Sequence, residues 1–215
     1  MMRALLLASL LAAAPAAHAA DAEALFAQGR FAEAVAAGSS AQSAAALIAA
    51  GRAASTEAAW RAPDRARAEA LLEQAEALFD RALKLEPRNT DAVLQRAITV
   101  GYRAKLRNSP GLARQARRGM EQVIERNPRD ALAHAALGGW HGEAVATLGR
   151  FVAGTALGAN RQGFEQSFEQ AMALGVRNEE YFYEFGLSYA YLKDCGNAVK
   201  WLEKALDLNP NSKPA

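Results

Sequence analysis

A spacing of small and bulky apolar residues recurs four times in this 215-residue chain, and it constrains the fold more than any other feature. In each copy a bulky residue follows the first residue by four positions, a small or β-branched residue follows three positions later, and a turn residue five positions after that. Offsets of four and three place the first three residues on one face of a helix, where small side chains let a neighbouring helix approach. A proline after the last turn prevents the helix from extending. The four copies are Ala75, Phe79, Ala82 and Pro87; Ala116, Met120, Val123 and Pro128; Phe164, Phe168, Ala171 and Val176; and Ala198, Leu202, Ala205 and Pro210.

Each copy is preceded by a second segment of apolar periodicity, so the predicted repeating unit is a helical hairpin. The pattern resembles that of the tetratricopeptide repeat (TPR) family, whose unit is about 34 residues long. The last unit shows the resemblance best, because counting Pro210 as position 32 starts the unit at Glu179 and places Gly186 at position 8. The other matches, at positions 11, 20, 24 and 27, are Tyr189, Ala198, Leu202 and Ala205.

The other units are longer than the family repeat. They run from Ala44 to Asn89, from Thr90 to Asp130 and from Ala131 to Asn178, which are 46, 41 and 48 residues. In all three the surplus falls between the two helices of the hairpin. The resemblance therefore implies an all-α fold, a right-handed superhelical array of about four TPR-like hairpins, several with extended helices, and a truncated hairpin ahead of them.

The expected organisation has four parts: residues 1–19 as a signal peptide, residues 20–43 as a truncated hairpin and linker, residues 44–212 as the helical array and residues 213–215 as a tail. The segment from Gly29 to Ala34 resembles the turn and second-helix start of a repeat, and Gly38 to Ser40 are predicted as the linker. Residues 135–174 are also similar to the corresponding region of the regulator of microtubule dynamics family and of exported bacterial repeat proteins.

The N-terminus has the features of a secretory signal peptide. A basic start at Arg3 precedes an apolar run from Ala4 to Ala14, and Ala17 and Ala19 are small residues at the positions that a signal peptidase reads. The run is shorter than the roughly 20 residues that a membrane span needs. We therefore expect cleavage after Ala19 and a periplasmic protein, with a short buried helix as the alternative.

Composition and charge exclude several classes of protein. A net charge of +2 with 22% charged residues argues against a disordered chain and against a dedicated nucleic-acid binder. The single cysteine, Cys195, cannot form an internal disulfide or a multi-thiolate metal site, and it is predicted to pack in the turn before the last helix. We expect no nucleic-acid partner and no cofactor.

The sequence contains none of the nucleophile, phosphate-loop, zinc-helix or dinucleotide signatures of common enzymes. We therefore expect no catalytic residues, no metal site and a protein that is not an enzyme. His134 and His141 lie about 10.5 Å apart along a helix, which is too far for both to bind one metal ion. With Glu143 they define the less favoured alternative, a metal-dependent hydrolase.

A tract without acidic residues lies between Asp91 and Glu121 and contains several basic residues. It is predicted to be either a solvated edge, with arginine stems covering alanine-rich helix, or a docking patch for an acidic peptide, phosphate or lipid headgroup. The second interpretation gives an alternative function, an envelope lipid- or glycan-associated factor that uses residues 96–118. The candidate residues are Arg103, Lys105, Arg107, Arg114, Arg117 and Arg118.

Arrays of this kind bind partners along the concave face formed by the first helices of their hairpins. The predicted face lacks the lysines and asparagines of the carboxylate clamp found in the TPR family, so an acidic C-terminal tail is not the expected ligand. We predict a non-catalytic protein-interaction scaffold that binds a partner segment in this groove. Its predicted residues are Arg52, Leu94, Ile98, Tyr102, Tyr183, Leu187 and Tyr191.

Two further surfaces are candidates for contacts. The extension from Gly149 to Ala159 is glycine-rich and apolar apart from Arg150, and we expect it to pack on the neighbouring hairpin. Contact with a membrane surface is the alternative. Ten of the sixteen Phe, Trp and Tyr residues follow Arg150, so the last hairpin, through Trp201 and its neighbours, is predicted to mediate self-association or partner docking.

Overall fold

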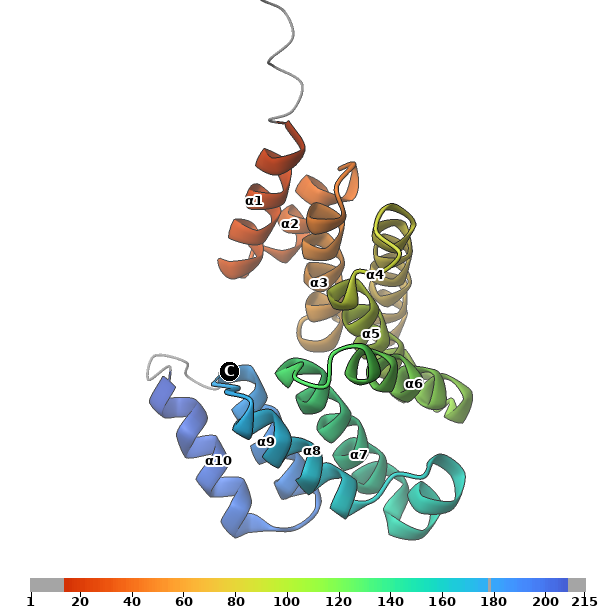
Figure 1. The fold of residues 1–215 in the computed structure, drawn as a ribbon, viewed down its shortest axis with the longest axis vertical. Helices are drawn as coiled ribbons and strands as arrows, with labels where there is room; N and C mark the ends of the chain where they lie inside the picture. The colour runs from red at the N-terminus through yellow and green to blue at the C-terminus, as the bar shows by residue number, and fades with distance from the viewer. Residues whose placement is uncertain (1–13, 178, 209–215) are drawn as a thin grey trace, which may run out of the picture. The chain divides into compact units, whose positions relative to one another are not determined.

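The computed structural model describes residues 14–177 and 179–208, and every regular element in these ranges is a helix (Figure 1). Most of the predicted signal peptide, the predicted tail and Pro210 lie outside the described residues. The chain divides into two compact units, residues 1–109 and 110–215. Unit 1 contains α1 (Ala14–Ala27), α2 (Phe31–Ser39), α3 (Ala44–Trp60), α4 (Arg65–Leu85) and α5 (Thr90–Arg107). Unit 2 contains α6 (Pro110–Arg126), α7 (Ala131–Val152), the π-helix η1 (Ala153–Leu157), α8 (Arg161–Ala173), α9 (Glu179–Tyr191) and α10 (Cys195–Leu208).

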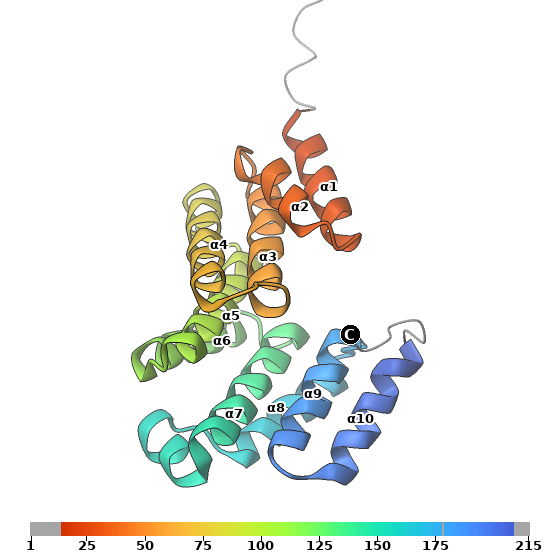
Figure 2. The same cartoon turned by 180° about the vertical axis from the view of Figure 1, so that it is seen from behind.

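Within each unit, helices pack as successive hairpins. In unit 1, α1 packs on α2 and α3 on α4, and the first helices of successive hairpins also touch, α1 with α3 and α3 with α5. In unit 2, α7 packs on α8 and α9 on α10, with α7 against α9, as the rear view shows (Figure 2). Contacts of this kind between neighbouring hairpins are typical of helical repeat arrays. The predicted all-α array of TPR-like hairpins is confirmed.

Polar side chains fix the starts of five helices besides α10. The residue before each helix accepts a hydrogen bond from a backbone N–H in the first turn, which satisfies a donor that the helix leaves free. The predicted helix ends are also found, because α4 stops two residues before Pro87 and α6 two residues before Pro128. The capping residues are Ser43, Asp64, Asn89, Asp130 and Asn160.

A glycine in the first helix of a hairpin faces the bulky residue of the second. A Cβ on Gly51 would lie 2.6 Å from the Phe79 ring, and one on Gly186 would lie 2.5 Å from Leu202. Gly138 stands in the same relation to Phe168, at 2.8 Å. These distances are too short for real Cβ contacts, so the glycines let the two helices approach closely. This contact explains why a bulky residue recurs at the same position of each repeat.

The middle repeat departs from this arrangement. The sequence predicts one hairpin from residues 90 to 130, yet the boundary between the two compact units falls inside it, between Ser109 and Pro110. The glycine position of the other hairpins is occupied here by Ala97. Each of the two helices is fixed within its own unit, α5 against α4 and α6 against α7.

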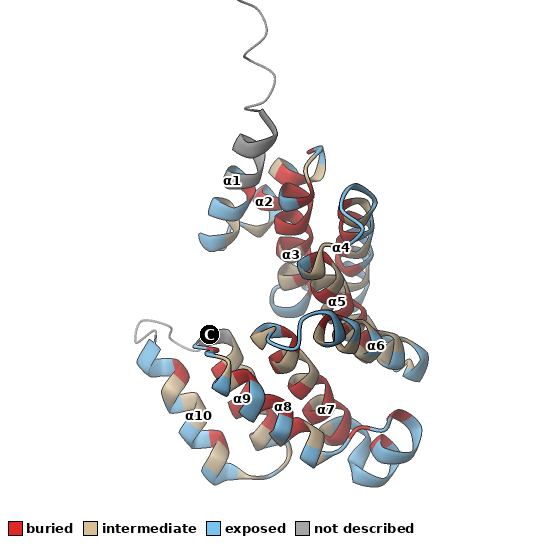
Figure 3. Ribbon diagram, viewed as in Figure 1, coloured by how far each residue is buried: buried red, intermediate tan, exposed pale blue. Residues whose placement is uncertain are grey.

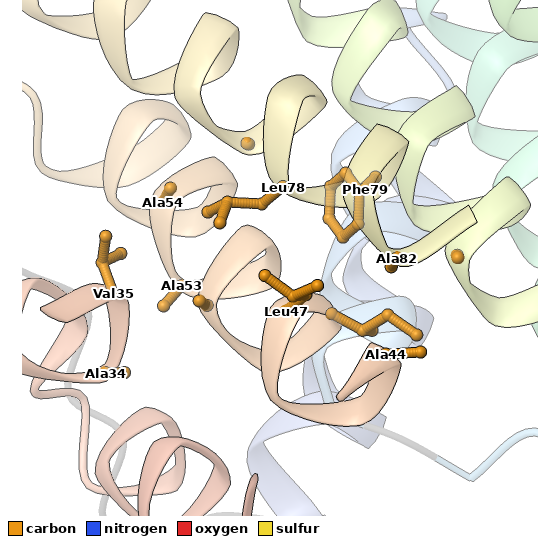
Figure 4. Close-up of a cluster of buried hydrophobic side chains, with 13 residues drawn as sticks. Ala34, Val35, Ala44, Leu47, Ala53, Ala54, Leu78, Phe79 and Ala82 are labelled. Carbon is orange, nitrogen blue, oxygen red and sulfur yellow. The ribbon is translucent and has the colours of Figure 1, made fainter. Parts of the chain in front are cut away.

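The core of unit 1 is built mainly from alanine. Small residues on α2, α3 and α4 surround Leu47, Leu78 and Phe79, as the close-up shows (Figure 4). The predicted linker residue Gly38 belongs to this packing and lies within α2, because a Cβ there would come within 2.5 Å of the Ala46 carbonyl oxygen. The linker prediction was therefore wrong for Gly38 and Ser39: this glycine serves a close helix contact and not chain flexibility.

The core of unit 2 is aromatic. Phe164, Phe168, Phe182 and Phe185 are buried between α7, α8, α9 and α10, and Trp201 is partly buried against them. Buried residues run along the inner faces of these helices (Figure 3). The aromatic residues that are concentrated in the second half of the sequence are therefore used largely inside the hairpins.

Candidate partner-binding surface

Helix α9 presents an aromatic and apolar face to solvent. Tyr183, Leu187 and Tyr191 are spaced four residues apart, so they share one side of the helix. Tyr191 is 55% exposed and Tyr183 is also exposed, whereas Phe182 and Phe185 on the same helix are buried. The three predicted residues of unit 2 therefore form one stripe, which we call the α9 stripe.

The neighbouring helix α7 contributes bare backbone at the equivalent position. Gly139 is the ninth residue of its hairpin, as Leu187 is of the next, and α7 packs on α9. A Cβ added at Gly139 would meet nothing within 4 Å, in contrast to the adjacent Gly138. An open glycine on a helix that packs against α9 leaves room for a partner chain to come close to the helix backbone. Gly139 is not among the residues predicted from the sequence, although the register counted from Ala131 places it at this position.

The four predicted groove residues of unit 1 are engaged in the fold. Arg52 pairs with Glu23 at 3.1 Å, and its guanidinium lies 4.4 Å from the centroid of the Phe26 ring, so it joins α3 to α1. Leu94 is only 2% exposed and belongs to the core, which means that its side chain is not available to a partner. Ile98 and Tyr102 are half-buried, and Tyr102 packs on a small cluster of α3 and α4 residues. The most exposed residues of the predicted surface are therefore Tyr183 and Tyr191, and Leu187 between them is half-buried.

The arginines of α5 are bound to the carboxylates of α4. Arg103 contacts Glu76 at 2.7 Å, Glu69 at 2.9 Å and Glu73 at 3.1 Å. Arg107 reaches Glu69 at 2.6 Å. Burial alone would lower the pKa of Arg103, but its hydrogen bonds to Glu76 and Glu69 raise it. These side chains hold two helices of unit 1 together, and the acidic residues that neutralise them lie outside the tract.

The α6 arginines serve a different purpose within unit 2. Arg114 and Arg117 donate hydrogen bonds to the carbonyl oxygens of Ala156 and Leu157, at 3.2 and 3.0 Å. Arg118 is exposed, and so is Lys105 on α5. The six predicted patch residues thus belong to two units and have several different roles within them.

The two histidines have separate structural partners. His134 lies 3.0 Å from the Pro128 carbonyl oxygen, and His141 Nδ1 accepts the Asn160 backbone N–H at 3.2 Å. Burial, with a smaller contribution from the Arg117 cation, lowers the pKa of His141 to about 4. Glu143 accepts a hydrogen bond from Thr147. Among the described residues, no three His, Cys, Asp or Glu side chains come together as a metal site.

On α10, Cys195 is exposed and Trp201 is half-buried. Cys195 is exposed at the first position of the helix, so its predicted packing role is wrong. Asp194 caps this helix through the Asn197 N–H, which leaves the thiol outside. Trp201 lies between Phe182 and Phe185, with ring centroids 5.4 and 5.5 Å away. The large apolar side chains of α10 that are exposed are Val199, Leu206 and Leu208.

A pocket of about 290 Å³ lies in unit 1, where the α1–α2 turn meets the end of α3. Its charges are mostly paired, since Arg30 binds Glu33 and Arg61 donates to the Gly29 carbonyl oxygen at 2.7 Å. Glu57 Oε2 is buried without a hydrogen-bond partner among the described residues. The pocket therefore offers a ligand little beyond this one carboxylate oxygen.

Comparison with known proteins places these features in a family. Residues 20–214 match the family described as Regulator of microtubule dynamics protein 1-3, so the likeness extends well beyond residues 135–174. The chain is similar in structure to TTC0263, a thermophilic TPR protein of Thermus thermophilus, with 20% identity, a TM-score of 0.67 and 93% of each chain covered. It is also similar to MamA 41-end from Desulfovibrio magneticus RS-1, with 16% identity, a TM-score of 0.50, and 93% of this chain and 97% of that chain covered. A comparison with curated proteins found no match. The structural likenesses show the TPR fold.

Proposed function

The chain belongs to the regulator of microtubule dynamics protein 1-3 family, and we propose that it is an exported, non-catalytic scaffold that binds a segment of a partner protein along the α9 stripe. The observation that carries this proposal is the exposure of Tyr183 and Tyr191 on the first helix of a TPR-like hairpin. First helices of repeat hairpins supply the binding face in such arrays.

The α9 stripe suits a segment with apolar side chains, whose polar backbone groups can hydrogen-bond to the tyrosine hydroxyls. Tyrosine combines a large apolar ring with a hydroxyl group, and it is enriched at binding hot spots. The open backbone at Gly139 allows close approach beside it. We expect a partner segment whose apolar side chains pack on the tyrosine rings.

A non-catalytic role agrees with the way the titratable groups are used. His134 and His141 are bound to backbone groups that hold a turn and a helix start. The α5 arginines are bound to α4 carboxylates, which makes them part of the scaffold.

Export is supported by the pattern of the first nineteen residues, with Arg3 before an apolar run and small residues up to Ala19. Expression in a bacterial host followed by fractionation and N-terminal sequencing tests it. We expect a periplasmic protein that begins at Ala20. A full-length chain in the cytoplasm would contradict export and leave the binding proposal to its own test.

The binding proposal is tested with a photoreactive amino acid at Tyr183, at Tyr191 and, as a control, at Val199, which is 54% exposed on α10. Irradiation in the native host should give the same crosslinked protein from both α9 positions and not from Val199. With that partner purified, we expect Tyr191→Ser to weaken binding by about tenfold, the effect of losing one aromatic anchor. Equal binding by Tyr183→Ser, Tyr191→Ser and wild type would overturn the role of the stripe.

A further inference from the structure

The last residues of α7 and the segment that follows them project from the bundle of unit 2. The helix is interrupted at Gly149, whose φ of 76° and ψ of 157° lie outside helical values. The chain then forms the π-helix η1 and turns back at Gly158, which has a φ of 69°. Most residues from Thr147 to Gly158 are exposed, as the pale blue loop beyond α7 shows (Figure 3). We call residues 148–158 the projection.

The projection is held by specific contacts. Two of its own side chains, Ala153 and Leu157, are buried and anchor it to unit 2. Arg114 and Arg117 bind its carbonyl oxygens from α6. A Cβ at Gly158 would lie 2.8 Å from the Arg117 guanidinium. Because these contacts fix the backbone at several points, the outward side chains are displayed by a structured element.

What the projection displays is apolar and cationic. Phe151 is 81% exposed, the most exposed of the large apolar side chains described. Leu148 and Val152 are exposed beside it, and so is Arg150. From residue 144 to residue 164 the sequence has no acidic residue. Arg114 adds its positive charge at the base, where its guanidinium meets the Ala156 carbonyl oxygen.

We infer that the projection docks on an anionic lipid bilayer, with Phe151 and Val152 entering the interface and Arg150 binding lipid phosphates. Three apolar side chains offer at most a few hundred Å², whereas a stable protein interface buries roughly 800 Å² per partner. A bilayer interface needs no such area, because one aromatic side chain and nearby cations already contribute binding free energy. The absence of acidic residues fits the negative surface of such a membrane. No helix among the described residues is long and apolar enough to cross a membrane.

Vesicle binding tests this inference with the full-length mature chain. Co-sedimentation should show binding to vesicles of phosphatidylcholine mixed with phosphatidylglycerol. We expect Phe151→Ser to weaken binding by about tenfold, since an apolar ring leaves the interface. Arg150→Ser should weaken it by about fivefold on the mixed vesicles only, because one phosphate contact is lost. Val199→Ser removes an accessible apolar side chain from α10 and should bind as wild type does.

The single native cysteine provides a second readout. A polarity-sensitive fluorophore on Cys195 of the wild type reports on α10, and the same fluorophore in Cys195→Ser/Phe151→Cys reports on the projection. We expect a blue shift with mixed vesicles at position 151 and none at position 195. Equal vesicle binding by wild type and Phe151→Ser, or a blue shift at position 195 alone, would overturn the inference. Loss of the crosslinked partner of α9 would leave it standing, because the two tests use different residues.

Discussion

The hairpins α3/α4 and α7/α8 both exceed the family repeat, with 46 and 48 residues, and they use the surplus in opposite ways. The first lengthens its helices to 17 and 21 residues, which run side by side and bury an alanine-rich interface. The second has a 22-residue α7 that is broken at Gly149, and α8 has only 13 residues. Extra length therefore becomes core in one hairpin and a displayed surface in the other.

The two hairpins nevertheless share one packing contact. Both hairpins close through a glycine against an aromatic ring, Gly51 with Phe79 and Gly138 with Phe168. Beyond that contact, α3 continues with alanine, whereas α7 meets a glycine with positive φ. A single backbone conformation decides whether the helix goes on packing or turns away from the bundle.

The largest effect is expected from truncating the shared ring. Phe79→Ala and Phe168→Ala each empty a buried site, and each should lower the free energy of unfolding by about 4 kcal/mol. Urea unfolding followed by circular dichroism measures this. Similar losses would show that both hairpins close by the same contact. A loss below about 1 kcal/mol for Phe168→Ala would break the comparison, since buried rings do not behave so.

Adjacent glycines in α7 provide a matched pair for the next effect. A Cβ at Gly138 meets the Phe168 ring, so Gly138→Val should cost about 3 kcal/mol through overpacking. Gly139 faces open space, so Gly139→Ala should raise stability by up to about 1 kcal/mol through helix propensity. Thermal melts of both variants check this. Equal destabilisation by both would mean that Gly139 is packed as tightly as Gly138.

Acid should lower the stability of the α7/α8 hairpin through protonation of His141. Its pKa of about 4 in the folded state lies below the ordinary value, so the unfolded chain binds the proton more readily. The free energy of unfolding is therefore unaffected by protonation of His141 above about pH 6.5 and decreases as the pH falls toward 4. The expected decrease is about 2 kcal/mol between pH 7.5 and 5. Urea titrations of wild type and His141→Gln over this range isolate the effect. The variant should lack this part of the pH dependence, and identical slopes for the two proteins would contradict it.

The smallest effect concerns the backbone conformation at Gly149, which distinguishes the α7/α8 hairpin from the α3/α4 hairpin. Gly149 adopts a φ/ψ combination open to glycine almost alone, so Gly149→Ala should cost about 1.5 kcal/mol. Gly154→Ala in η1 is the control, because its φ is ordinary and a Cβ meets only the Ala159 carbonyl oxygen at 3.9 Å. Differential unfolding by urea compares them. An unchanged stability of Gly149→Ala would show that α7 can extend without its break.

The sequence was sufficient for the hairpins because their signals are local. Prolines and small residues at fixed spacing record where a helix ends and where it touches its partner within the same repeat. The division after Ser109 was not predicted, because contacts that join α5 to α4, such as that of Arg103 with Glu76, link residues 27 positions apart in the sequence. Arg103 and Arg107, which have no acidic neighbours in the sequence, form ion pairs with glutamates of the adjacent helix α4. Gly38 was misassigned because a glycine signals both a flexible linker and a close contact.

The candidate surfaces were predicted unevenly for a similar reason. The register of the last hairpin identified Tyr183 and Tyr191 because the periodicity of an isolated helix suffices to place them. Leu94 occupies the equivalent register but is covered by its neighbours, and no local pattern reports that. Phe151 was included only within an apolar extension, and its exposure follows from the break at Gly149, whose positive φ is a property of the folded backbone.

In each packed pair of described helices, the partners are neighbours in the chain or have a single α-helix between them. Few long loops must therefore close before native contacts form, a topology associated with fast folding. Under the export proposed above, α1, α2 and α3 would assemble while the later hairpins are still in transit. Vectorial folding of this kind limits the time during which apolar faces remain open to aggregation.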